Sequence, residues 1–115
     1  MSQENLDNRG MEAKDEFVIA VVWYRPEQWQ RVQDISTDQE QFEESYAEWL
    51  QQASEKIEIL RRTGTRVEKV DIDSEQLILW CNERGLENNA NARTLYAAER
   101  LHDLEEQRSI FQRRP

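Results

Sequence analysis

The residues best placed for chemistry are two acidic side chains at the end of an expected β-strand. Asp71 and Asp73 stand two positions apart in the segment D-I-D-S-E. Functional groups of α/β proteins often lie at strand ends, and hard cations such as Mg²⁺ accept carboxylate oxygens. Both residues also fit structural roles, Asp73 as a helix N-cap and Asp71 on the exposed side of an edge strand or in an ion pair with Arg25. We favour the structural interpretation, because it accounts for both carboxylates.

Two aromatic residues end the apolar segment just before Arg25 and Pro26. An aromatic floor beside a guanidinium group is typical of a site for a small anionic ligand. A glycine-rich phosphate loop is not available, because the three glycines lie far apart in the chain. The candidate ligand-binding residues are Trp23, Tyr24, Arg25, Asp71 and Asp73.

The remaining reactive residue types are single. Cys81 is the only cysteine and His102 the only histidine, so the chain offers neither a zinc ligand set nor an internal disulfide. If the last two helices form a hairpin, these two side chains lie about 10 Å apart along it, too far for a nucleophile and its base. We therefore predict no catalytic residue, no metal and no cofactor, and a lone cysteine fits a reducing, cytoplasmic location.

The charge balance argues against nucleic-acid binding. The chain has 24 acidic and 15 basic residues, a net charge of -9, whereas such binding depends on basic side chains that neutralise phosphates. One local basic cluster comprises Arg61, Arg62, Arg66 and Lys69. Cations there favour the C-terminal end of a helix dipole, so we expect no nucleic-acid partner.

The longest apolar run, Phe17 to Tyr24, indicates a strand buried on both faces. Its eight residues are far fewer than the ~20 that a membrane helix needs, so no membrane partner is expected. A short helix is predicted from Pro26 to about Asp34. The longest helix is predicted over residues 38–62, opened by a T-x-x-E capping box at Thr37 and closed by Gly64. Its apolar face comprises Phe42, Tyr46, Trp49, Leu50, Ala53, Ile57 and Leu60.

The second half of the chain predicts one more strand and two more helices. Residues 65–72 alternate as in a half-exposed edge strand. Asp73 then caps a helix that stops at Gly85, and a last helix starts near Ala92 and runs to about Glu106. In that helix the apolar residues recur every three positions, so their line rotates around the helix axis. These residues are Leu95, Ala98, Leu101 and Leu104.

The element order is strand, helix, helix, strand, helix, helix, which predicts an α/β domain with about four helices. The connection between the strands is long enough for a parallel crossover. Two strands are too few for a stable sheet, so either helices cover both faces and edges or a second copy completes the sheet. We expect the homodimer, since two-fold dimers are the commonest assemblies. Residues 16–107 form the expected single domain, between a flexible tail at 1–15 and a frayed end at 108–115.

Several short segments give the chain a family resemblance. They are Arg25 to Trp29, Val70 to Asp73, Trp80 to Leu86, and Ala92 with Arg93. Together they resemble a family of small bacterial proteins of unknown function, over about Phe17 to Glu99. The resemblance implies a bacterial and cytoplasmic origin, and it carries no activity and no functional residues.

These observations predict a protein that binds rather than catalyses. An apolar strand with too few neighbours and no convergent catalytic set favour a non-enzymatic, homodimeric interaction module. The alternative is a small enzyme or anionic-ligand-binding protein that uses Arg25, Asp71 and Asp73 at the strand ends.

Overall fold

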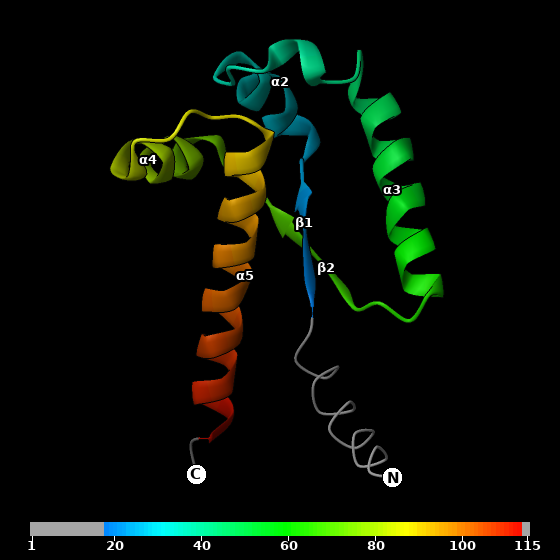
Figure 1. Ribbon diagram of the computed structural model, residues 1–115, viewed down its shortest axis with the longest axis vertical. Helices are drawn as coiled ribbons and strands as arrows, with labels where there is room; N and C mark the ends of the chain where they lie inside the picture. Colours follow the sequence, from blue (N-terminus) through cyan, green and yellow to red (C-terminus); the bar gives the residue numbers. More distant parts are fainter. Residues whose placement is uncertain (1–17, 114–115) are drawn as a thin grey trace, which may run out of the picture.

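The computed structural model describes the backbone of residues 18–113 and the side chains of residues 18–108 (Figure 1). The order of its elements confirms the predicted α/β class with four α-helices and a parallel two-stranded sheet, in the order βααβαα. The elements are β1 (Ile19–Trp23), α2 (Pro26–Asp34), the 3₁₀ turn η1 (Gln39–Gln41), α3 (Tyr46–Arg62), β2 (Val67–Asp71), α4 (Ser74–Arg84) and α5 (Ala90–Arg113).

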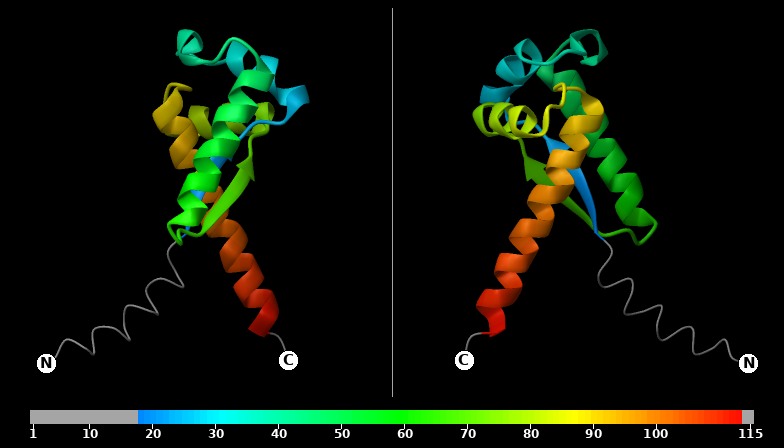
Figure 2. Two further views of the ribbon diagram at one scale, coloured as in Figure 1. Left: turned by 90° about the vertical axis from the view of Figure 1, so that its right-hand side faces the viewer. Right: turned by 60° about the vertical axis from the view of Figure 1, so that its left-hand side comes forward.

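The sheet lies between two helices. The strands pair in register from Ile19 opposite Val67 to Trp23 opposite Asp71. Helix α5 packs on one face, while α3 lies along the other, as the two turned views agree (Figure 2). Successive side chains of β1 therefore alternate between the α5 side and the α3 side, which explains why the whole strand is apolar.

The larger part of the core lies beyond the C-terminal ends of the strands. There α2, α4 and the start of α5 enclose buried side chains, and the aromatic rings of α3 pack against them. The buried members are Tyr24, Trp29, Val32, Ile72, Leu77, Cys81, Ala92 and Tyr96. A smaller cluster joins Val70 of β2 to Ala97 and Leu101 of α5. The core is thus concentrated at one end of the sheet.

The prediction of one continuous helix from residue 38 was wrong. The chain forms η1, then an extended residue at Phe42, and α3 begins only at Tyr46 with Ser45 as its N-cap. Ser45 and Glu48 repeat the capping pattern that Thr37 and Glu40 offer, so local sequence allows both starts. Tertiary contacts decide between them, because the Thr37 N–H donates to the carbonyl of Asn88 instead of opening a helix.

Local signals predicted the boundaries of α4 correctly. Asp73 caps its start by accepting a hydrogen bond from the N–H of Gln76 at 3.0 Å. Gly85 ends it in the left-handed conformation, with φ of 64°, where a residue without a Cβ atom avoids strain. The second strand is half-exposed, as expected, with Val67 and Val70 buried and Lys69 and Asp71 exposed.

Helix α5, not α3, is the longest helix. It has 24 residues and continues to Arg113, beyond Glu106 where its end was predicted, whereas α3 has 17 residues. Its apolar line rotates as expected, since Leu95 is 56% exposed and Leu101 only 8%. The expected tail at residues 1–15 lies outside the described residues. Between residues 18 and 113, no helix has the length and apolarity required to cross a membrane.

Candidate functional site

The parallel register brings the predicted site residues Arg25 and Asp71 together. The Arg25 guanidinium donates to Asp71 Oδ2 at 3.1 Å and to Glu27 Oε2 at 3.1 Å. These hydrogen bonds, to Glu27 and then Asp71, raise the pKa of Arg25. The side chains of Arg25 and Asp71 are each 55% exposed, so solvent screens the pair and its contribution to stability is small.

Asp73 lies beside this ion pair but performs a structural role. It caps α4, and the next N–H, from Ser74, donates to Gln28 Oε1 on α2 at 2.8 Å. A shallow depression of about 260 Å³ connects the predicted residues, lined by Arg25, Glu27, Gln28, Asp71, Ile72 and Asp73. The strand ends therefore form a small polar depression in which the guanidinium already contacts two carboxylates.

The two aromatic residues of the predicted site point elsewhere. The ring of Trp23 lies 4.9 Å from that of Trp49 on α3, and Lys69 Nζ lies 4.2 Å from the Trp23 ring. Tyr24 is buried and packs edge-on against Trp29, with ring centroids 5.7 Å apart. Burial raises the pKa of Tyr24, an effect that the nearby Arg93 guanidinium partly opposes. Neither ring forms a floor beside Arg25.

Arg93 is at the centre of a buried polar cluster that the sequence did not predict. Its guanidinium donates to both carboxylate oxygens of Asp38, at 3.1 and 3.0 Å, and to Ser36 Oγ at 2.9 Å. It also donates to Asn88 Oδ1 at 3.2 Å and lies 4.8 Å from the ring centre of Phe42. The only available signal was an arginine beside Ala92 on a buried helix face. The cluster joins the start of α5 to the loop after α2.

The remaining reactive side chains do not converge. Cys81 is buried, and burial raises the pKa of its thiol. His102 is exposed and lies 3.6 Å from Glu106 on the same helix. Among the residues that the structure describes, no three His, Cys, Asp or Glu side chains form a group that could hold a metal ion.

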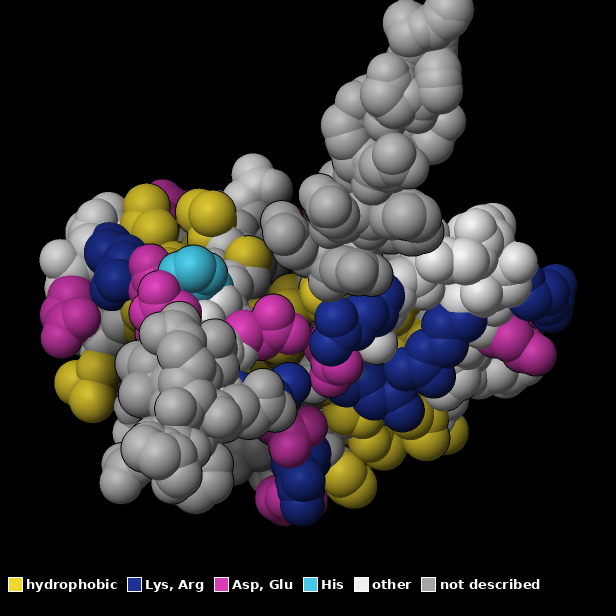
Figure 3. Space-filling view, turned by 90° about the horizontal axis from the view of Figure 1, so that it is seen from below, with side chains coloured by type: hydrophobic (Ala, Val, Ile, Leu, Met, Phe, Trp, Pro, Cys, Tyr) yellow, Lys and Arg dark blue, Asp and Glu magenta, His cyan; other side chains and the backbone are white. Residues whose placement is uncertain are grey.

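Basic side chains gather where α3 ends and β2 begins (Figure 3). Most have an acceptor or an acid within the chain. Arg61 donates to the carbonyl of Val67, Arg62 pairs with Glu58 at 3.7 Å, and Arg66 pairs with Glu68 at 3.7 Å. Lys69 covers the Trp23 ring, as described above. These contacts fit the structural role that the sequence indicated for the cluster.

The free edge of β1 is an apolar surface that the described residues cover only in part. A groove of about 320 Å³ follows this edge between α3 and α5. Its lining residues are Ala20, Val21, Val22, Glu43, Trp49, Gln52, Ala53, Lys56, Ile57, Leu60 and Thr94. All five residues of β1 are only half-buried although all are apolar. The strand is thus enclosed on both faces and open along one edge.

The hydrogen-bond pattern identifies which backbone groups this edge presents. The Ile19 N–H donates to Arg66, and the Trp23 carbonyl accepts from Ile72, so odd-numbered residues of β1 face β2. The even-numbered residues Ala20 and Val22 therefore direct their N–H and C=O groups into the groove. The Tyr46 hydroxyl closes the end of the edge by donating to the carbonyl of Tyr24 at 3.0 Å. From Tyr24 back to the start of β1, the described residues supply no partner strand for this edge.

Comparison of the chain with protein-family models, curated proteins and solved structures finds no match. The resemblance to a family of small bacterial proteins therefore stays a prediction.

Proposed function

We propose that this protein is a non-enzymatic interaction module that forms a homodimer through the free edge of β1. The observation that carries the proposal is the groove along an apolar strand, where residues 18–113 supply no strand beside the Ala20 and Val22 backbone groups. Unpaired strand edges are templates for pairing with another chain. A second copy fits because the edge can pair with itself around a two-fold axis.

The apolar face of α3 supports the same arrangement. Of the seven residues predicted for this face, Phe42 precedes α3, only Ile57 is buried, and the other six remain half-buried. A two-fold axis perpendicular to the sheet would place β1 antiparallel to its copy and extend the sheet to four strands. The same axis would bring α3 beside its copy, where this face could lose its remaining contact with water.

The charges along the groove are compatible with an antiparallel copy. Glu43 precedes α3 at one end of the groove, and Lys56 lies on α3 toward the other end. Because the axis reverses the direction of α3, the acidic end of one groove lies beside the basic end of its copy. This complementarity favours the second copy of the chain as the occupant.

The alternative, an enzyme or anion-binding protein that uses the strand ends, has weaker support. Arg25 is the cation that would receive an anion there, and it already pairs with Asp71 and Glu27. Asp73 serves as the cap of α4. An incoming anion would have to displace two carboxylates from an exposed guanidinium, so its binding would gain little free energy.

The experiment measures molar mass by light scattering at micromolar concentration for three proteins. The wild type should have twice the mass of one chain. Ala20→Pro removes an N–H that faces the groove without breaking the β1–β2 ladder, and should give a folded monomer. Lys69→Pro is the matched control, because odd-numbered residues of β2 face the outer edge of the sheet. It should stay dimeric.

Two outcomes would overturn the proposal. A wild type of single-chain mass at these concentrations would exclude the dimer. A dimeric Ala20→Pro variant would place the interface elsewhere. Amide exchange of Ala20 and Val22 is a second measurement. Slow exchange of these amides in a monomer would mean that a part of the same chain outside the described residues covers the edge.

A further inference from the structure

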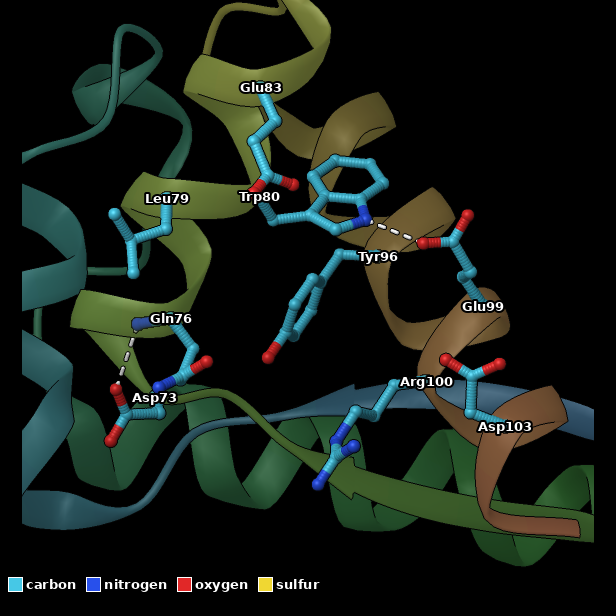
Figure 4. A pocket seen from close by; sticks show the side chains of 9 residues that line it. All are labelled: Asp73, Gln76, Leu79, Trp80, Glu83, Tyr96, Glu99, Arg100 and Asp103. Carbon is cyan, nitrogen blue, oxygen red and sulfur yellow. Dashed lines mark hydrogen bonds between the residues drawn. The ribbon is translucent and has the colours of Figure 1, made fainter. Parts of the chain in front are cut away.

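A second hollow lies between α4 and α5, on the opposite side of α5 from the β1 edge. Thr94 lines the groove and Tyr96 lines the hollow, and residues two apart point about 200° apart around a helix. The hollow has a volume of about 600 Å³, within the range of small-molecule sites. Its lining is shown in Figure 4: Asp73, Gln76, Leu79, Trp80, Glu83, Tyr96, Glu99, Arg100 and Asp103.

One wall of this hollow is held in place by a chain of contacts. The Trp80 indole N–H donates to Glu99 Oε1 at 2.7 Å, and Arg84 donates to the same oxygen at 2.8 Å. The Arg84 guanidinium also lies 4.5 Å from the Trp80 ring centre. The hydrogen bond from Trp80, with the charge of Arg84, lowers the pKa of Glu99. These contacts hold the Trp80 ring in place, and the exposed Leu79 adds apolar surface to the same hollow.

The floor of the hollow carries the polar end of Tyr96. Tyr96 is 7% exposed, and its ring packs edge-on against Trp80 with centroids 5.5 Å apart. Its hydroxyl points into the hollow on the side of Gln76 and Arg100 (Figure 4). Within residues 18–108 this hydroxyl forms no hydrogen bond to another side chain or backbone group. The hydroxyl oxygen is not among the enclosed unpaired side-chain atoms, so it is accessible from the hollow and can hydrogen-bond to a molecule that enters there.

Charges of both signs surround that hydroxyl. The Arg100 guanidinium and the Asp73 carboxylate are the two charges that act on Tyr96. Arg100 is exposed, and it makes no ion pair with any described residue. Asp73 uses one oxygen, Oδ1, for the cap of α4 and retains the other. Asp103, one turn after Glu99 on α5, adds a further carboxylate to the rim.

We infer that this hollow binds a free α-amino acid with an apolar side chain. Its carboxylate would accept hydrogen bonds from the Tyr96 hydroxyl and the Arg100 guanidinium. Its ammonium group would lie beside the Asp73 carboxylate, next to the Tyr96 hydroxyl, and its side chain would lie against Leu79 and Trp80. A simple cation leaves Arg100 unmatched, and a simple anion meets several carboxylates, so a zwitterion complements the hollow best. This inference does not rest on the proposed dimer.

The test uses three ligands that share one ring and differ in their charged groups. L-Phenylalanine carries both groups, phenethylamine lacks the carboxylate, and 3-phenylpropanoic acid lacks the amine. Titration calorimetry of the full chain should detect L-phenylalanine at millimolar concentration, with the amine binding about tenfold more weakly and the acid not detectably. No heat from L-phenylalanine would overturn the inference, and so would equal affinity for the amine.

Variants assign each group to a residue. Arg100→Gln should weaken L-phenylalanine binding about tenfold and leave phenethylamine unchanged, and Tyr96→Phe should act in the same sense. Asp73→Asn keeps a good N-cap but removes the charge, so it should weaken both ligands. Arg108→Gln, on the same helix outside the hollow, is the control and should bind like the wild type. If Arg100→Gln and Asp73→Asn both bound L-phenylalanine as tightly as the wild type, the ligand would lie elsewhere.

Discussion

Strand β1 and the segment that follows it differ in how completely the chain covers them. At its C-terminal end the strand enters a closed core in which Tyr24 and Trp29 are buried. Its middle, at Ala20 to Val22, is equally apolar but only half-buried and open along one edge. The two regions follow one another in the chain and are both apolar, so composition does not explain the difference.

The difference follows from where the other elements lie. Helices α2 and α4 and the loop around η1 all gather at the closed end, and Arg93 fastens α5 to that loop. Along the open edge only α3 and α5 are present, one on each face. Among the described residues, the other elements gather at the closed end and none covers the edge. We therefore expect the closed end to give the monomer most of its stability, and the proposed dimer uses the edge.

The largest expected effect breaks the closed end. Arg93→Met removes a guanidinium that is 5% exposed and leaves the Asp38 carboxylate, 14% exposed, without its cation. Leaving a buried charge unpaired costs about 3–5 kcal/mol of unfolding free energy. Urea denaturation should show this loss. Arg62→Met, which removes an exposed pair with Glu58, is the control and should change stability by less than about 0.5 kcal/mol. A small loss for Arg93→Met would mean that the cluster does not hold the closed end.

A second comparison separates stability from assembly with one substitution in each region. Leu77 is fully buried at the closed end, and Leu77→Ala should cost about 2–5 kcal/mol at every protein concentration. Leu60 is half-buried in the groove, so Leu60→Ala should cost less but weaken the dependence of the melting temperature on protein concentration. Calorimetric scans over a hundredfold concentration range measure both. Equal concentration dependence in the two variants would contradict the assignment of the groove to a dimer.

Features set by neighbouring residues were predicted well from the sequence. The apolar run identified β1 to within two residues at its start and one at its end, and Asp73 and Gly85 fixed the limits of α4. Each signal lies within four residues of the structure it specifies. The start of α3 was misplaced because two capping patterns compete, and a contact with Asn88, 51 residues away, decides between them.

The candidate sites also divide into one that the sequence indicated and others that depend on contacts between distant residues. The approach of Arg25 to Asp71 follows from the parallel register, and the sequence had indicated this ion pair as one of the roles open to Asp71. The partners of Arg93 lie up to 57 residues away and bear no regular relation to it. The hollow at Tyr96 likewise depends on the packing of α4 against α5. Periodicity places a residue on a helix face, but it does not specify what that face meets.

Two substitutions of Asp73 separate the contribution of its cap to stability from that of its charge. Asp73→Ala removes the acceptor for the N–H of Gln76 and should cost about 1 kcal/mol of unfolding free energy. Asp73→Asn keeps the acceptor and should cost only a few tenths of that amount. Urea denaturation of the two variants provides the measurement. If both variants lost equal stability, the charge rather than the cap would be the important feature of Asp73.

The smallest expected effect concerns the contact between Trp80 and Glu99 in the wall of the hollow, and it changes stability only at acidic pH. The hydrogen bond from Trp80 holds the pKa of Glu99 below its ordinary value of 4.5. A carboxyl whose pKa is lower in the folded state contributes stability above the unfolded value, and that contribution is lost as the pH falls through the folded value. Glu99→Gln lacks this titration, so its melting temperature should fall less than that of the wild type below about pH 4.5. Trp80→Phe, which removes the indole N–H, should flatten the acid limb in the same direction. Parallel wild-type and Glu99→Gln curves over this range would show that the contact does not couple to folding.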